Sequence, residues 1–244
     1  GGAAVLGSIQ PQPLPQAADG SIPLDAVRAA IKPIDPHFAR SKILCLENTW
    51  HGRPLPLDYL AEARALCDAR GLGLHLDGAR LFNAAVAQGV PAAAITRHFD
   101  SVSVCLSKGL GAPVGSVLLG SAALIEKARR WRKVLGGGWR QAGILAAACF
   151  NALDHQVERL AEDHRRAAAL AAGLQALGLA VEPTPTNLVF VQVPEARLDA
   201  LRASLSEAGI LASVGGPRIR LATHLDIDDP AVAAVSAAFA RALG

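Results

Sequence analysis

The sequence predicts an α/β protein with a mostly parallel sheet and helices on both faces, followed by a smaller α+β unit. Short apolar runs at 41–46, 72–77 and 101–105 alternate with helical patterns at 57–70 and 82–88. Strands of this kind, separated by helices, are typical of a parallel sheet that is covered on both faces. Composition agrees, because 51% of the 244 residues are hydrophobic and only 18% are charged.

The other elements are expected from the same patterns. After a short apolar stretch at 3–9, prolines at positions 11, 13 and 15 exclude a helix interior in the segment around them. Further helices are expected at 24–31, 121–132, 141–177, 196–208 and 230–243, and further strands at 115–119, 188–193 and 218–222. The pattern changes after the three glycines at 136–138. We therefore expect a large domain over 1–141, and a hinge helix with a small C-terminal domain over 142–244.

Charge and cysteine content exclude several function classes. Twenty-four basic and 21 acidic residues give a net charge of +3, which does not indicate a nucleic-acid partner. No apolar stretch reaches the roughly 18 residues that a membrane span needs. The four cysteines form no Cys-x-x-Cys pair, so we expect reduced thiols, mostly in the core, and a cytoplasmic protein. The chain begins at Gly1 and contains no methionine, so we expect it to be truncated, processed or partly recorded.

Lys108 is the first candidate for chemistry. It follows the apolar strand at 101–105 and precedes Gly109, and Gly111 lies two residues further on. Glycines let another molecule approach the backbone, and a desolvated amine acts as a nucleophile. The alternative is a solvated loop lysine. A Walker loop is excluded, because its lysine follows the glycines.

Asp77 is the second candidate, at the carboxyl end of another expected parallel strand. Ligands of open α/β sheets collect at that edge. An aspartate there holds a protonated heterocyclic nitrogen or a metal ion, or it caps the next helix. His75 shares its strand face but has no second ligand at metal spacing, so we expect a core histidine and no metal site.

A basic run at 127–133 has two further interpretations. One aromatic residue, Trp131, lies among its charges, as in some nucleic-acid patches. At helical spacing the charges are distributed around the helix, so we favour a solvated helix and no nucleic-acid partner.

Six motifs in order along the chain resemble the low-specificity L-threonine aldolases, which depend on pyridoxal phosphate and have the aspartate-aminotransferase fold (fold type I). The motifs are Glu47-Asn48-Thr49, residues 75–80, residues 103–116, residues 130–133, residues 136–141 and residues 220–224. Trp139 departs from the family, in which methionine is usual. Family members also begin earlier, with a segment that carries the phosphate-binding loop and the residue stacked on the cofactor ring, and we expect that segment to be absent here.

The resemblance implies roles in cofactor binding for four residues. Lys108 matches the lysine that binds the cofactor covalently, and Asp77 the acid that pairs with its ring nitrogen. Arg80 matches an arginine beside that acid. Arg140 is a candidate phosphate contact.

The resemblance also implies how the substrate is held. Arg220 matches the arginine that binds the substrate carboxylate, for which a planar guanidinium fork is the suitable partner. Lys133 approaches the active site in the family. His37 matches a histidine near the substrate hydroxyl, and without the resemblance it would be a surface residue.

The function implied is that of an aldehyde-lyase that cleaves L-threonine or L-allo-threonine to glycine and acetaldehyde. The resemblance further implies a homotetramer, a dimer of dimers with sites shared across an interface. Two alternatives stay open. One is another reaction on the same fold, β-elimination or transamination, and the other is an inactive scaffold.

Overall fold

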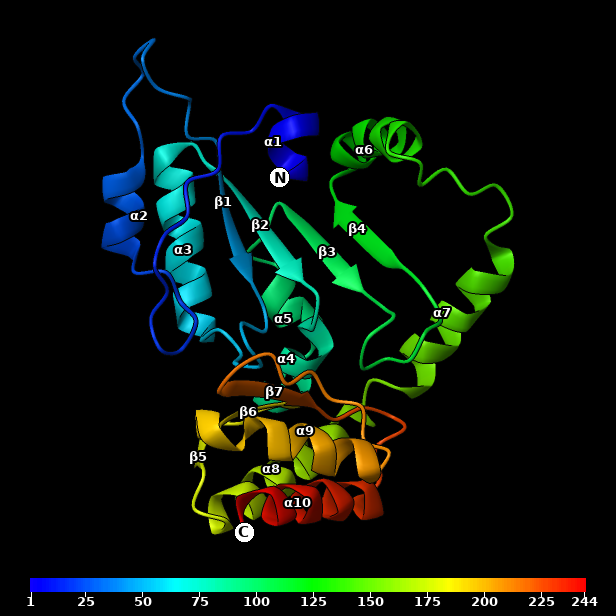
Figure 1. Ribbon diagram of the computed structural model, residues 1–244. Coiled ribbons are helices and arrows are strands. Elements are labelled where there is room, and N and C mark those ends of the chain that lie inside the picture. Colours follow the sequence, from blue (N-terminus) through cyan, green and yellow to red (C-terminus); the bar gives the residue numbers. More distant parts are fainter.

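The computed structural model describes residues 1–244, which form two sheets with separate hydrophobic cores (Figure 1). The helices are α1 (Gly2–Gly7), α2 (Leu24–Ala30), α3 (Leu57–Arg70), α4 (Leu81–Gln88), α5 (Ala92–Thr96), α6 (Ala122–Val134), α7 (Gly143–His155), α8 (Leu160–Ala176), α9 (Leu198–Glu207) and α10 (Asp229–Leu243), with a 3-10 turn at Glu195–Arg197. The strands are β1 (Ile43–Glu47), β2 (Gly73–Gly78), β3 (Ser101–Cys105), β4 (Ser116–Gly120), β5 (Ala180–Val181), β6 (Leu188–Gln192) and β7 (Arg218–Ala222). No helix combines the length and the apolar character needed to cross a bilayer.

The first sheet has the order β1-β2-β3-β4, in which β1 to β3 are parallel and β4 is antiparallel at the edge. This confirms the predicted α/β class with a mostly parallel sheet. Alternate side chains of a strand point to opposite faces. The buried face is apolar and lies toward α3, α4 and α5, as Figure 1 shows; its side chains include those of Leu44, Leu46, Leu74, Leu76, Val102 and Val104.

The opposite face of this sheet is polar. Cys45, Glu47 and Asp77 are exposed there, and His75 is half-buried with its Nδ1 2.7 Å from the hydroxyl of Ser101. The nearly continuous apolar runs predict strands buried on both faces, yet β1 and β2 alternate between buried and more exposed positions. The chemistry of these strands is therefore concentrated on one face and at its carboxyl end.

The helix α3 illustrates how the first layer forms. Its buried residues Leu60, Ala63, Leu66 and Cys67 are spaced three and four apart, which gives one apolar stripe against the sheet. Gly71 ends the helix with a φ of 63°, a left-handed conformation that glycine adopts without a steric penalty. The chain is thereby turned back into β2.

The second unit contains the antiparallel sheet β5-β6-β7, with α8, α9 and α10 on one face (Figure 1). Its other face contacts the loop that follows β1. The Thr186 hydroxyl donates to the carbonyl oxygen of Gly52. Glu182 accepts from Arg53 at 2.8 Å and from Arg218 at 2.7 Å, and these contacts hold its pKa below the ordinary value.

The predicted single helix at 141–177 is wrong. The structure contains two helices, α7 and α8, separated by residues 156–159. Neither glycine nor proline lies in this break, so no local signal marks it. Leu160 still belongs to the first core and Ala167 to the second, and the chain reorients where its packing partners change. The domain division at 141 stays a prediction.

Two smaller expectations also need correction. Only Cys67 is buried, whereas Cys45 is exposed and Cys105 and Cys149 are half-buried, although all four are free as predicted. The short elements α1, α5 and β5 were not predicted, because segments of two to six residues give too little periodicity.

Candidate functional site

Two carboxylates lie side by side at the carboxyl end of the first sheet. Glu47 ends β1 and Asp77 lies near the end of β2, and the strand register pairs the two residues directly. Lys108 follows β3, the next strand across the sheet. Because β1 to β3 are parallel, these three residues come to one edge, as the sequence predicts for Asp77 and Lys108.

Backbone contacts fix Asp77 in this position. Its Oδ1 accepts the amide of Ala79 at 3.0 Å, and its carbonyl oxygen accepts the amide of Asn48 at 2.9 Å. Behind it, Gly78 lies so close to β3 that an added Cβ would be 2.8 Å from the carbonyl oxygen of Ser103. The carboxylate therefore extends from a tightly packed strand end.

Three cationic side chains at this edge have no partner in the structure. Arg80, Lys108 and Arg220 take part in no ion pair and no side-chain hydrogen bond, and Lys108 and Arg220 are exposed. Burial lowers the pKa of Arg80, and the nearby charge of Arg220 lowers it further. Unpaired cations that repel one another favour an anionic ligand between them.

Glu47 is a further member of this cluster, and in the sequence it is marked only as part of the Glu47-Asn48-Thr49 motif. Partial burial and the charge of Asp77 raise the pKa of Glu47, while Arg80 and Lys108 act in the opposite direction. Its position at the end of an apolar run is the signal that the sequence offers. The register that makes the two carboxylates neighbours becomes known only from the sheet order.

His51 is a second residue that sequence reasoning missed. Its ring lies edge-on to Phe190, with centroids 5.3 Å apart, and burial followed by the charge of Arg218 lowers its pKa. The charge of Arg220 acts on it in the same direction. His51 therefore stands where the loop after β1 meets β6 and β7, beside the predicted substrate arginine.

Three predicted site residues are not brought to this edge within the chain. His37 lies in the loop before β1, at the opposite end of that strand, with its side chain 86% exposed and its Nδ1 2.7 Å from Asp35. Lys133 lies in the last turn of α6, and Arg140 lies in the segment between α6 and α7; both are exposed (Figure 1). Their roles stay predictions.

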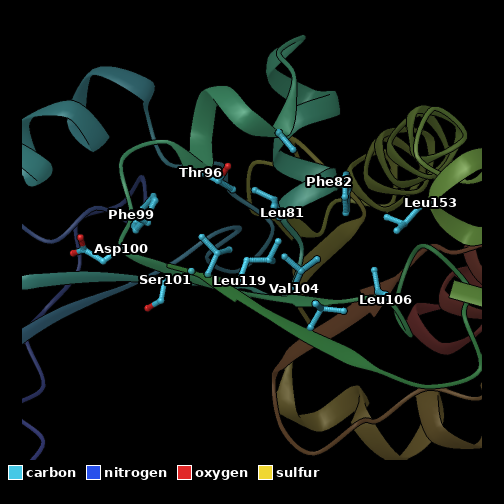
Figure 2. Close-up of a pocket in the computed structure, with 14 residues that line it drawn as sticks. Leu81, Phe82, Thr96, Phe99, Asp100, Ser101, Val104, Leu106, Leu119 and Leu153 are labelled. Carbon is cyan, nitrogen blue, oxygen red and sulfur yellow. The ribbon is translucent and has the colours of Figure 1, made fainter. Parts of the chain in front are cut away.

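A cavity lined mostly by apolar side chains lies elsewhere in the molecule. Its volume is about 420 Å³, and Figure 2 shows it between the apolar face of β3 and β4 and the helices α4 and α5. The lining is mostly apolar, including Leu81, Phe82, Val104 and Leu119. It offers no cluster of titratable groups, so the strand-end cluster remains the candidate site.

Comparisons with known proteins identify the family. Residues 1–196 match the model of the beta-eliminating lyase family. The chain is 52% identical over 237 residues to the low specificity L-threonine aldolase of Escherichia coli (strain K12), a match covering 97% of this chain and 71% of that protein. The chain belongs to the low-specificity L-threonine aldolase family. The predicted resemblance is thus confirmed.

Other members of the family and of the fold agree. Low-specificity L-threonine aldolase 1 of Arabidopsis thaliana is 42% identical over 241 residues, which cover 93% of this chain and 67% of that protein. The threonine aldolase of Leishmania major superposes with a TM-score of 0.76 at 22% identity, over 93% of this chain and 69% of the other. At that identity the second comparison shows a shared fold.

Within this aldolase-family chain, four of the seven predicted site residues converge. Asp77, Arg80 and Lys108 come from the first sheet, and Arg220 comes from β7 of the second. The charge of Arg220 acts on Arg80 across the junction between the two units. This cluster therefore combines residues of both sheets, and Arg220 is more than 100 residues from the other three in the sequence.

Proposed function

We propose that this protein is a pyridoxal-phosphate-dependent lyase that cleaves L-threonine or L-allo-threonine to glycine and acetaldehyde. The observation that best supports this proposal is that three cationic side chains without a protein partner lie near the Asp77 carboxylate, namely those of Arg80, Lys108 and Arg220. A phosphorylated pyridine aldehyde and an amino acid together supply two anionic groups, a basic ring nitrogen and a carbonyl carbon. Each of these groups has a suitable partner, either in this cluster or in Arg140, the predicted phosphate contact.

The residues present fit the cofactor by the chemistry of their side chains. Asp77 would bind the protonated ring nitrogen, and Lys108, which has no competing partner, would bind the aldehyde carbon through its amine. Arg80 would bind beside Asp77, and Arg140 would contact the phosphate. When bound, pyridoxal phosphate supplies an electron sink for cleavage of the bond between the α and β carbons.

The protein's own side chains would orient the amino acid. Arg220 would bind the substrate carboxylate through two parallel N–H donors, which fixes the direction of the Cα–Cβ bond. Lys133 would lie near the substrate. His37, directly or through a water molecule, would take the proton of the β-hydroxyl group as general base.

The proposal includes assembly into a homotetramer in the cytoplasm. His37 supports an assembly, because the length of β1 separates it from the Asp77 edge of its own chain. Lys133, in the last turn of α6, and Arg140, between α6 and α7, are also exposed. In a dimer of dimers with shared sites, these residues would complete the site of a neighbouring chain.

A second candidate function is β-elimination on the same fold, because the matching family model is that of the beta-eliminating lyases. A product assay distinguishes the two. The protein is incubated with pyridoxal phosphate and L-threonine, L-allo-threonine or L-serine, and acetaldehyde, glycine and 2-oxo acids are measured separately. Glycine and acetaldehyde in equal amounts support the aldolase, whereas 2-oxo acid with ammonia supports elimination. No product and no visible absorption band from bound cofactor would contradict both.

A further inference from the structure

Arg159, one residue before α8, joins three parts of the chain through its guanidinium group. Nη1 and Nη2 donate to the two carboxylate oxygens of Asp163 at 2.7 and 3.2 Å. Nη2 also donates to the carbonyl oxygen of Gly109 at 2.8 Å, and Nε donates to Gln156 at 2.7 Å. Gly109 follows Lys108, so the start of α8 is bonded to the loop that carries the free ammonium group.

The partner of Arg159 is fully buried. The side chain of Asp163 has 0% exposure, and that of Arg159 has 19%. A buried carboxylate is costly unless it is paired and hydrogen-bonded, and a two-pronged guanidinium contact meets both conditions. The ion pair therefore fixes where Arg159 lies, in contrast to an exposed pair, which contributes little.

The backbone of Asp163 connects to the second unit. Its carbonyl oxygen accepts the Thr223 hydroxyl at 2.6 Å. The backbone amide of Thr223 donates to the carbonyl oxygen of Asn187 at 3.0 Å, and Nδ2 of Asn187 donates to the carbonyl oxygen of Thr223 at 3.0 Å. Both residues are buried. Thr223 lies three residues after Arg220. The first turn of α8 is thus bonded to the end of the strand that carries the predicted substrate arginine.

Packing holds Gly109 against the same helix. An added Cβ at Gly109 would lie 2.8 Å from Cδ2 of Leu160 and 3.6 Å from Oδ1 of Asn83. Asn83 in turn is 3.1 Å from Nε2 of His164 on α8. The loop after Lys108 therefore has little room to move relative to this helix.

We propose that Arg159 and Asp163 are positioning residues that set the Lys108 loop and the Arg220 strand at one fixed separation, so that the amine and the guanidinium bind the same molecule. Neither residue would touch that molecule, because they act through Gly109 and Thr223. The identity of the molecule rests on the proposed function, whereas the coupling between the two segments does not.

The test is native-state hydrogen exchange on the full chain without cofactor. The amides to follow are those of Gly111 and Ala112, which donate to the carbonyl oxygens of Lys108 and Leu106, and that of Thr223. The variants are Arg159→Gln, Arg159→Lys and Thr223→Val, of which the last preserves side-chain size. The control is Arg165→Gln, because Arg165 lies on α8 and binds Asp229 through two contacts of 2.8 and 3.0 Å, but is half-exposed.

In Arg159→Gln we expect exchange at Gly111, Ala112 and Thr223 to be about tenfold faster, since the charged hydrogen bond to Gly109 is lost and the buried Asp163 carboxylate, whose backbone holds Thr223, is left without its cation. Arg159→Lys should lie between this variant and the wild type, because it keeps the charge but not the fork. Thr223→Val should speed exchange at Gly111 and Ala112, although Thr223 does not contact that loop. Arg165→Gln should leave all three amides unchanged.

Two results would overturn the proposal. One is unchanged exchange at Gly111 and Ala112 in both Arg159→Gln and Thr223→Val. The other is an equal acceleration at every protected amide of the chain, matched by a lower free energy of unfolding in urea, which would show a role in global stability alone. Absence of acetaldehyde from the wild type would refute the proposed function and would leave the exchange result to be judged by itself.

Discussion

The substitution Gly78→Ala tests whether the close contact between Gly78 and Ser103 determines the position of Asp77. In Gly78→Ala, the new Cβ would lie 2.8 Å from the Ser103 carbonyl oxygen and 3.3 Å from Cβ of Leu81. Backbone oxygens cannot rotate away, so β2 must move from β3 by several tenths of an ångström. Overpacking of this kind typically costs about 1–3 kcal/mol. The reduced entropy of the unfolded chain offsets about 0.4–1 kcal/mol of that cost.

Gly73→Ala is the matched control, because Gly73 lies on the same strand with nothing nearer than 3.7 Å to an added Cβ. We expect Gly78→Ala to lower the free energy of unfolding by about 1–2 kcal/mol, and Gly73→Ala to leave it unchanged or slightly higher. The movement should also displace Asp77, so we expect cofactor binding and turnover to fall about tenfold or more in Gly78→Ala alone. Urea unfolding and a cofactor titration measure both effects. Equal stability and equal cofactor affinity in the two variants would refute the reasoning.

Three further predictions concern single side chains. Lys108→Ala should abolish the visible absorption band of bound cofactor and turnover, with unfolding in urea unchanged because Lys108 has no partner; persistence of the band would exclude Lys108 as the binding amine. Arg220→Ala should raise KM for threonine about 30-fold or more, the equivalent of about 2 kcal/mol, and an unchanged KM would place the carboxylate elsewhere. The carboxylate of Asp100 accepts hydrogen bonds from the backbone amide of Leu74 at 2.7 Å and from Nη1 of Arg64 at 2.9 Å. These two hydrogen bonds lower the pKa of Asp100 from 3.8. Its contribution is therefore fully present above pH 3.8 and is lost as pH falls through the lower folded pKa, so the unfolding free energies of wild type and Asp100→Asn should differ at pH 7 and converge at strongly acidic pH.

The sequence predicts the α/β order of this protein well where strands and helices are long and bounded by glycine or proline. It fails at residues 156–159, because the break between α7 and α8 depends on Arg159 reaching Gly109, Gln156 and Asp163. The contacts with Gln156 and Asp163 are local, but the contact with Gly109 joins residues 50 positions apart, and no local pattern encodes it. Tertiary packing thus overrides the helical periodicity at this point.

The same distinction explains which site residues could be found from sequence. Asp77 and Lys108 each end an apolar strand, which is a local signal, and parallel strands bring such ends to one edge without further information. Glu47 and His51 needed the sheet order and the position of β6 before their surroundings could be known. His37 carried no local signal, and its own chain does not bring it to the edge.

The alternation within β1 and β2 connects the fold to the chemistry. The register of the two strands pairs Leu44 with Leu74 and Leu46 with Leu76 on the helix side, and Glu47 with Asp77 on the other side. A register shift of one residue would move the leucines to the polar face, so burial of the core strongly disfavours any other pairing. Burial of the hydrophobic core thereby keeps the Glu47 and Asp77 carboxylates next to each other, although their charges repel. Nearby cations offset that repulsion, and because none of the three has a protein partner of its own, they remain available to an anionic ligand.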